Sequence, residues 1–352
     1  MLRGHGGEIY HLALELGVSP AEIQDHSSNV SPLSPPAGLY SLLKRHLPEI
    51  EHLPEVDSFS LRRALAARFA LPADCFLPSS GTTEWIFALP RVLSPERAFI
   101  LGPTYGDYAD SLRQARVPFE YLLARREEGF RPPLEELDAR LTGGELIFLC
   151  NPNNPTGVYL RPADLRSLMA AHPRSVFVVD ESYVDFHPEG RSLLEDGLPA
   201  NAVVLYSFSK IFRLPGLRLG VCAAAEPQAK RLREAELPWA VNRLAQVAGP
   251  WLLEQGSHVQ AVREFVERER RRFLPHLAEI AGLRVFAGEI HFFLLELDRP
   301  ARPVWEALLR RHLILVREAS NFAGLGSNFL RLALKSEAEN NRLLRALKEV
   351  LR

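Results

Sequence analysis

The sequence has few cysteines, almost no net charge and no long apolar run. Its three cysteines, Cys75, Cys150 and Cys222, form no C-x-x-C pair, which argues against a disulfide scaffold or a structural zinc site and favours a reducing cytoplasm. With 42 basic and 43 acidic residues, the net charge of −1 provides no field that attracts nucleic acid. No apolar run approaches the ~20 residues of a membrane span, and residues 1–17 lack the pattern of a signal peptide. We therefore expect a cytoplasmic protein with no metal and with neither nucleic acid nor membrane as a partner.

The 352 residues, 47% hydrophobic and 24% charged, have the composition of a globular protein. Short, continuous apolar runs alternate with helical patterns in the middle of the chain, as in strands buried on both faces of a parallel sheet. This rhythm predicts a doubly wound, mostly parallel α/β sheet followed by a smaller α+β domain. The four clearest runs span residues 98–101, 146–150, 176–179 and 202–206. We expect an N-terminal arm over residues 1–35, a large domain over 36–250 and a small domain over 251–352.

Two segments are interpreted without a function. The Pro- and Ser-rich stretch from Ser27 to Pro36 fits neither helix nor central strand, and it is interpreted as a linker. The long amphipathic helical pattern after residue 255 carries a basic outer face from Arg263 to Arg272. Such a face is usually solvated, and we expect the same here.

Polar residues directly follow three of the apolar runs, where ligands of a doubly wound sheet bind. Residues 151–157 read N-P-N-N-P-T-G, a turn with more asparagines than a turn requires. The next run ends in D-E-S-Y over 180–183, and the last in S-F-S-K over 207–210. A lysine in a dry cleft has a lowered pKa and a nucleophilic amine. These three segments are therefore the candidates for chemistry.

Two further motifs suit a phosphate. Residues 80–84 place a glycine and two threonines at a predicted helix start, a natural phosphate cradle, and Arg218 lies eight residues after Lys210. Taken singly, each feature is weak, because an acid after a strand is more often a helix cap and a lone lysine a surface charge. Together they describe a site for pyridoxal 5′-phosphate, which needs a Schiff-base lysine and a carboxylate facing its ring nitrogen.

The chain resembles the fold type I, class I/II aminotransferase superfamily over nearly its whole length. The motifs that carry this resemblance are, in order, G-T-T-E, P-T-Y-G-D-Y, N-P-N-N-P-T-G, D-E-S-Y, S-F-S-K and G-L-R-L-G. The resemblance implies the pyridoxal-phosphate transferase fold and a homodimer. It implies that Lys210 forms the Schiff base and that Asp180 keeps the ring nitrogen protonated. Asn154 and Tyr183 would donate to the ring oxygen, and Tyr105 would stack on the ring. The implied ligands of the cofactor phosphate are Gly81, Thr82, Thr83, Ser207, Ser209 and Arg218.

Within the superfamily, several stretches are more similar to threonine-phosphate decarboxylases than to histidinol-phosphate aminotransferases. They span residues 5–7, 28–33, 237–242, 317–325 and 331–340. The resemblance implies that His5 and Asn29 bind a substrate phosphate and that Arg331 binds the substrate carboxylate next to Asn154, with Arg317 or Lys335 as a further cation. Without it, His5 is interpreted as a mobile terminal residue and Arg331 as an arginine at a strand end.

The sequence departs from these relatives at three places. His291 occupies a position where relatives often have asparagine. Leu53 stands where relatives carry a tyrosine that reaches the neighbouring subunit's cofactor phosphate, and His52 is a possible replacement. Glu8 stands where the decarboxylase arm has asparagine, and a carboxylate there repels a phosphate unless it points away or pairs with an arginine.

Three functions remain open at this point. The first is decarboxylation of L-threonine O-3-phosphate in cobalamin biosynthesis, and the second is transamination of histidinol phosphate with 2-oxoglutarate. The third, a non-catalytic cofactor-binding protein, would usually show a broken lysine or aspartate. The choice between the first two depends on which substrate group Arg331 leaves perpendicular to the cofactor ring. A perpendicular carboxylate leads to decarboxylation, and a perpendicular Cα proton leads to transamination.

Overall fold

A seven-stranded sheet forms the centre of the larger part of the chain in the computed structural model, which describes residues 6–352. Its strands in spatial order are β2 (Phe76–Ser79), β8 (Gly220–Ala224), β7 (Ala202–Ser207), β6 (Val176–Asp180), β5 (Leu146–Cys150), β3 (Ala98–Gly102) and β4 (Phe119–Leu123). From β4 to β7 neighbouring strands are parallel, whereas β8 is antiparallel to both of its neighbours. The predicted, mostly parallel α/β sheet is confirmed, and the four apolar runs are β3, β5, β6 and β7.

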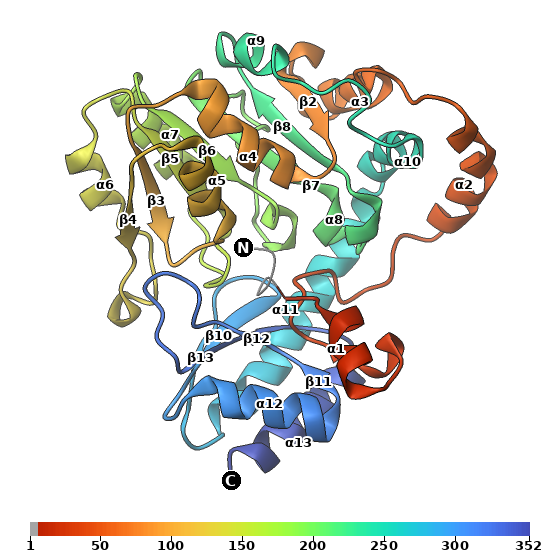
Figure 1. Ribbon diagram of the computed structural model, residues 1–352, viewed down its shortest axis with the longest axis vertical. Helices are drawn as coiled ribbons and strands as arrows, with labels where there is room; N and C mark the ends of the chain where they lie inside the picture. The colour runs from red at the N-terminus through yellow and green to blue at the C-terminus, as the bar shows by residue number, and fades with distance from the viewer. Residues whose placement is uncertain (1–5) are drawn as a thin grey trace.

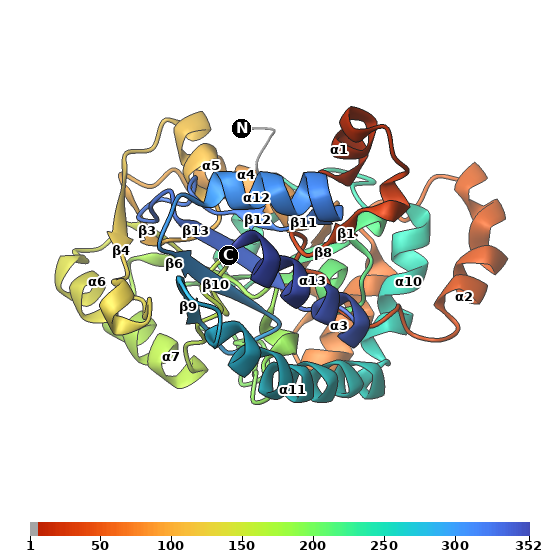
Figure 2. The ribbon, with the colours of Figure 1, turned by 90° about the horizontal axis from the view of Figure 1, so that it is seen from below.

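Helices cover both faces of this sheet. Helices α4 and α5 lie on one face, and α6 and α7 lie on the other (Figures 1 and 2). The helices of this part are α2 (Leu39–His46), α3 (Phe59–Phe69), α4 (Thr82–Leu93), α5 (Asp107–Ala115), α6 (Leu134–Arg140), α7 (Pro162–Ala171), α8 (Phe208–Ile211), α9 (Gln228–Arg233) and α10 (Arg243–Leu253). Short 3₁₀ turns span Pro20–Glu22, Leu47–Glu51, Ala73–Cys75, Arg126–Glu128, Val184–Phe186 and Pro215–Leu217. Every residue of β3, β5 and β7 is buried, because the sheet is covered on both faces.

A smaller antiparallel sheet follows in the chain. Its order is β12 (Arg317–Glu318), β13 (Phe329–Ala333), β10 (Phe292–Leu297) and β9 (Leu283–Phe286). Helices α11 (Gly256–Ala278), α12 (Ala301–His312) and α13 (Glu337–Val350) lie along its outer side, as seen from below in Figure 2.

The start of the described chain belongs to this smaller sheet in space. Helix α1 (Ile9–Leu16) lies beside α12 (Figure 1), and β1 (Gln24–Asp25) pairs in parallel with β11 (Ile314–Leu315). A small apolar cluster that includes Ala13 and Leu309 joins α1 to α12. As a result, the segment from α1 to β1 is held against the smaller sheet and its helix α12.

The stretch from Ser27 to Pro36 is not a linker, contrary to the prediction. Ser27, Asn29 and Ser31 are buried, and the Ser31 backbone N–H donates to the Lys210 carbonyl at 2.9 Å. Because the segment makes its hydrogen bonds to distant backbone, it needs no regular secondary structure to be ordered. It therefore forms part of the wall beside α8.

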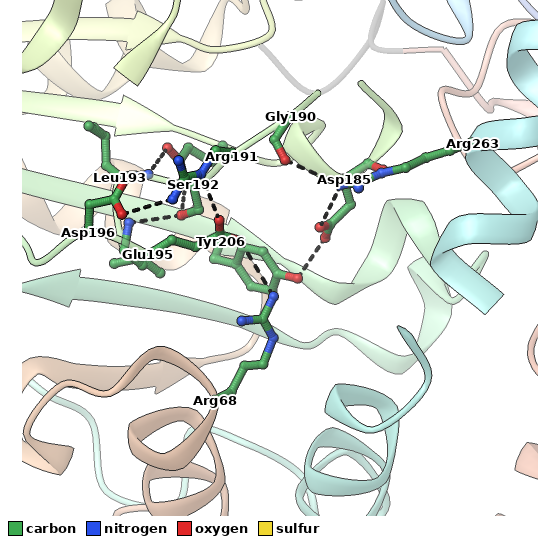
Figure 3. Close-up of polar contacts among 12 residues, drawn as sticks. Arg68, Asp185, Gly190, Arg191, Ser192, Leu193, Glu195, Asp196, Tyr206 and Arg263 are labelled. Atoms are coloured by element: carbon green, nitrogen blue, oxygen red, sulfur yellow. Dashed lines mark hydrogen bonds and ion pairs between the residues drawn. The ribbon is translucent and has the colours of Figure 1, made fainter. Parts of the chain in front are cut away.

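The basic face of α11 is also not merely solvated, which corrects the second prediction. Arg263 donates to the carbonyls of Asp185 and Gly190, as Figure 3 shows. Arg270 donates to Ala287 and Gly288 carbonyls at 2.9 and 2.7 Å. A guanidinium carries several donors in a rigid fork, so one arginine satisfies several loop carbonyls at once. These arginines tie α11 to the loops it crosses.

Among the described residues, no helix combines the length and the apolar character needed to cross a bilayer.

Candidate active site

A cavity of about 510 Å³ lies beyond the carboxyl ends of β5, β6 and β7. It is lined by most of the residues that the motifs predicted: Asn29, Gly81, Thr82, Thr83, Tyr105, Asn154, Asp180, Tyr183, Ser207, Ser209, Lys210, Arg218 and Arg331. Arg317 lines an adjoining cavity of about 30 Å³ together with Asn154 and Arg331. His5 lies outside the described residues. The fold therefore gathers into one place residues that are up to 300 positions apart.

Lys210 lies on α8, immediately after β7. Ser207 caps this helix by accepting a hydrogen bond from the Ser209 backbone N–H at 3.3 Å. Burial and the positive charges of Arg331 and Arg218 together lower the pKa of the Lys210 ammonium to about 8, against the opposing effect of Asp180. About a tenth of the amine is therefore unprotonated and nucleophilic at pH 7.

Asp180 is the last residue of β6, and its carboxylate is fully oriented. Oδ1 accepts from the Ser182 hydroxyl at 2.6 Å and from its backbone N–H at 3.0 Å, while Oδ2 accepts from the Tyr108 hydroxyl at 2.7 Å. Burial raises the pKa of Asp180, and these hydrogen bonds partly offset the rise. A buried acid of this kind gains a great deal from a cationic partner, such as a protonated ring nitrogen.

Tyr108, on α5, was missed by the sequence reasoning. Its ring is completely buried, stacks on Phe148 with centroids 5.1 Å apart, and meets Tyr105 edge-on at 5.7 Å. The available signal was its position three residues after Tyr105, which places two tyrosines on neighbouring turns.

A phosphate-sized cradle is built at the start of α4. Gly81, at φ 81°, precedes the helix, and a Cβ at this position would lie 2.4 Å from Arg218 Nη2. At Gly220, a Cβ would lie 2.5 Å from the Thr82 backbone nitrogen. Arg218 donates to the carbonyl of Ser80 at 3.3 Å, so its guanidinium crosses the amide end of the helix. Helix amides, hydroxyls and a guanidinium are together the donor set that fits a phosphate monoester.

The three asparagines of the turn after β5 divide their tasks. Asn151 pairs with the backbone of Leu160 through both ends of its amide, and Asn153 donates to the Pro103 carbonyl. These two shape the turn. Asn154 points its Oδ1 towards the cavity, where it accepts from Arg331 Nη1 at 2.5 Å.

The smaller sheet contributes two arginines that face each other across paired strands. Arg331 on β13 lies opposite Arg317 on β12 in the strand register. Arg331 Nη2 donates to the Ser27 carbonyl at 2.5 Å, and Arg317 Nη2 donates to Asn321 at 2.5 Å. Burial lowers the pKa of each guanidinium to about 10. In both residues the buried Nε has no partner among the described residues, so the pair retains donors for an anion.

The turn at Ser27 and Ser28 connects these arginines to the arm, which sequence reasoning could not foresee. Asp25 Oδ1 accepts from the Ser27 hydroxyl at 2.6 Å and from the backbone N–H of both serines. Lys335 Nζ donates to the Ser28 carbonyl at 3.1 Å, and Gly7 donates to the Ser27 hydroxyl at 2.7 Å. The Gly7 and Lys335 contacts join residues 20 and 307 positions apart.

Comparisons with known proteins agree with this geometry. The family model "Aminotransferase class I and II" matches residues 48–347. The chain is 34% identical to threonine-phosphate decarboxylase of Salmonella typhimurium over 99% of this chain and 96% of that protein. It is 33% identical to histidinol-phosphate aminotransferase of Symbiobacterium thermophilum over 98% and 95% of the two chains. L-Threonine-O-3-phosphate decarboxylase of Porphyromonas gingivalis has a similar structure, with a TM-score of 0.85, 29% identity, and 94% and 99% of the chains covered.

Proposed function

Because the chain belongs to the class I and II aminotransferase family, we propose that this pyridoxal 5′-phosphate enzyme acts on a small phosphorylated amino acid, with L-threonine O-3-phosphate decarboxylation as its reaction. The observation that carries the proposal is the pair of buried arginines, Arg331 and Arg317, beside the cavity that holds Lys210. One guanidinium suffices for a carboxylate, so two of them with open donors suit a substrate that carries a carboxylate and a phosphate. A role in cobalamin biosynthesis is part of the proposal.

The residues present fit the cofactor. Asp180 would face the ring nitrogen, Asn154 and Tyr183 the ring oxygen, and Tyr105 the ring face. Thr82, Thr83, Ser207, Ser209 and Arg218, with the close backbone approach at Gly81, would hold the phosphate. When bound, the cofactor supplies an electron sink for the bond that breaks at the substrate's α-carbon.

The chain's own groups would direct the reaction. Lys210, with its pKa lowered to about 8, provides an amine that accepts or returns a proton near the α-carbon. Arg331 is held rigidly by Asn154 and the Ser27 carbonyl, so it fixes the direction of the substrate carboxylate. We propose that this direction places the carboxylate perpendicular to the cofactor ring, which favours loss of CO₂. Asn29 and His5 would bind the phosphate, with Arg317 as the cation.

The 33% identity to a histidinol-phosphate aminotransferase favours a second candidate. Histidinol phosphate has no carboxylate, so Arg331 would then serve the 2-oxoglutarate half of the transamination. Both candidates share the cofactor site and a phosphate-bearing substrate.

We also propose a homodimer, supported by a surface formed by α2, the residues after it and the loop at 237–239. Helix α2 stands away from the large sheet (Figure 1), and Leu53 is 75% exposed. The Trp239 backbone N–H donates to the Val56 carbonyl at 2.9 Å, which joins the two segments. The exposed apolar side chains of this surface are Tyr40, Leu47, Ile50, Leu53, Val56, Phe59, Leu237 and Trp239. Exposed large apolar side chains concentrated on neighbouring segments are typical of an association surface. Leu53, one of them, lies next to His52 in the sequence.

The division into an arm (1–35), a large domain (36–250) and a small domain (251–352) is likewise proposed, as is a cytoplasmic location. The two sheets support the division. The location is supported by the three cysteines, all unpaired and buried.

A substrate panel tests the reaction. Purified protein loaded with pyridoxal 5′-phosphate is incubated with L-threonine O-3-phosphate, or with histidinol phosphate and 2-oxoglutarate, with Lys210→Ala as the matched control. We expect CO₂ and aminopropanol phosphate from the first mixture. Glutamate from the second mixture alone would assign the aminotransferase, and turnover of neither would overturn the proposal. Light scattering of Leu53→Asp, which should turn a dimer into a monomer, tests the assembly.

A further inference from the structure

His291, just before β10, is completely buried, and neither of its ring nitrogens makes a hydrogen bond of ordinary geometry among residues 6–352, although the Asn29 backbone lies close enough to interact with the ring. Its ring orientation is fixed by neighbouring rings: it stacks on Phe186 with centroids 3.6 Å apart and meets Phe292 at 5.1 Å and 75°. An unpaired buried polar atom is costly and rare in a folded protein, so a histidine held rigidly in this state calls for a role.

The surroundings of His291 keep its imidazole neutral. Burial lowers its pKa well below the usual value, and the positive charges of Lys335, Arg331 and Lys210 lower it further. A hydrogen-bonding interaction with the backbone of Asn29 acts in the opposite direction and places Asn29 next to the ring. A neutral imidazole carries one N–H donor and one acceptor, so this ring can donate at one nitrogen and accept at the other.

Tyr183 and Asn29 lie between this histidine and the cavity. The ring of Tyr183 is 6.1 Å from that of His291, and its hydroxyl is 3.5 Å from Asn29 Nδ2. Asn29 Oδ1, at the other end of the same amide, is buried and has no partner among the described residues. Two polar groups that need partners, an imidazole and an amide oxygen, therefore flank one tyrosine.

We propose that His291 is a positioning residue for Tyr183. Its N–H donates to Asn29 Oδ1, directly after a small side-chain rotation or through one bridging water, and fixes which end of the amide faces the tyrosine. Asn29 Nδ2 then donates to the Tyr183 oxygen, and the tyrosine's own proton is left to point at the cofactor ring oxygen. The inference rests on the proposed function, because Tyr183 has this task only where pyridoxal 5′-phosphate is bound.

The test separates hydrogen bonding from packing. His291→Phe keeps a flat ring without nitrogens, whereas His291→Asn keeps a donor and an acceptor without the ring. His258→Phe is the matched control, because His258 also stacks on a phenylalanine (Phe212, 5.9 Å) and has an unpartnered buried Nε2, whereas it is His291 that packs beside Tyr183. The measurements are the pH midpoint of the visible absorbance of the Lys210–cofactor imine and the unfolding midpoint of the cofactor-free chain.

When the hydrogen bond to the cofactor ring oxygen is weaker, the negative charge on that oxygen stabilises the imine proton more strongly. The pH midpoint at which the imine loses this proton should therefore rise. We expect a rise of roughly 0.5–1 unit in His291→Phe, equivalent to the loss of one ordinary hydrogen bond. His291→Asn and His258→Phe should leave the midpoint in place. In a Tyr183→Phe background, the His291→Phe change should have no additional effect, because the histidine acts through the tyrosine.

An unchanged midpoint in His291→Phe overturns the inference. A rise in His291→Asn equal to that in His291→Phe also overturns it, because it shows that the ring is needed only for packing. His291→Met is the alternative apolar replacement if the phenylalanine variant does not fold. A wild-type chain that shows no visible absorbance after loading contradicts the proposed function itself, so the two failures are distinguishable.

Discussion

The two walls of the candidate active site are built in different ways. On the large-sheet wall, most functional side chains lie at the carboxyl end of a strand or within a few residues of it, as Asp180 and Lys210 do, whereas Arg218 lies just before the antiparallel strand β8. On the small-sheet wall, Arg331 lies inside a strand. Its guanidinium is held in place by a hydrogen bond to the Ser27 carbonyl, 304 positions away in the chain. The first wall is local and repetitive, whereas the second depends on contacts between distant segments.

This difference separates the cofactor from the substrate. The large-sheet wall holds the groups that fit pyridoxal 5′-phosphate, and its geometry follows from the general rule for doubly wound sheets. The small-sheet wall and the arm hold the groups proposed to select the substrate and its reaction. Variants on the first wall should therefore change the absorbance of the bound cofactor, and variants of the substrate-facing arginines on the second should change kcat/KM without changing that absorbance. His291 is the exception, because it is proposed to act through Tyr183 on the first wall.

The largest effect should come from Lys210→Ala on the first wall. Removal of the amine abolishes the covalent link to the cofactor and the proton transfer, so turnover should fall by at least about 10⁴-fold. Absorbance spectra and the substrate panel measure both losses. Lys335→Ala is the control, since this second buried lysine, with a pKa lowered to about 8, lies on the other wall and should leave the cofactor's absorbance intact.

Arg331→Lys should have the largest effect on the second wall. A lysine cannot make the bidentate contact or keep both anchors, so kcat/KM should fall by about 10²–10³-fold. The cofactor's visible spectrum should be unchanged. An equal loss of cofactor absorbance would show that the two walls are not separable and would break the comparison.

Loading of the cofactor should depend on pH through the amine of Lys210 on the large-sheet wall. Lys210 has a folded-state pKa of about 8, below the ordinary value of 10.5, so the reactive free amine is populated as pH rises through 8. The rate of imine formation in cofactor-free protein should increase by about 50-fold from pH 6 to pH 8 and then level off, since each pH unit changes the free amine about tenfold below the pKa. A rate that still climbs tenfold per unit up to pH 10 contradicts the lowered pKa.

The smallest effect is expected for Tyr108→Phe, which keeps the stacked ring and removes the 2.7 Å hydrogen bond to Asp180. Loss of one hydrogen bond to a carboxylate should reduce kcat by roughly 10-fold or less. Stopped-flow assays under substrate saturation provide the measurement, with Tyr121→Phe as the control on a neighbouring strand. If kcat stays within twofold of wild type, Tyr108 has only a packing role.

The predictions from sequence succeeded and failed along the same division. The strands and the residues after them could be located because a continuous apolar run and a following polar group both lie within ten residues. The hydrogen bond between the Ser27 carbonyl and Arg331 could not be predicted, because no local pattern specifies which carbonyl accepts from a buried guanidinium. The prediction for Arg263 and Arg270 on α11 was wrong for the same reason. A charged helix face has the same sequence pattern whether water or loop carbonyls accept its hydrogen bonds.

By itself, the sequence determined the sheet and the class of cofactor, and it predicts Lys210 as the nucleophilic lysine. Strand burial and the residue types that pyridoxal 5′-phosphate needs can both be recognised within short segments. Only the tertiary structure decided that Tyr108 supports Asp180, that the Pro- and Ser-rich stretch is a wall of the site, and that His291 lies behind Tyr183. Those facts depend on the packing of elements far apart in the chain, and hydrogen-bond partners over such separations are chosen by the fold as a whole.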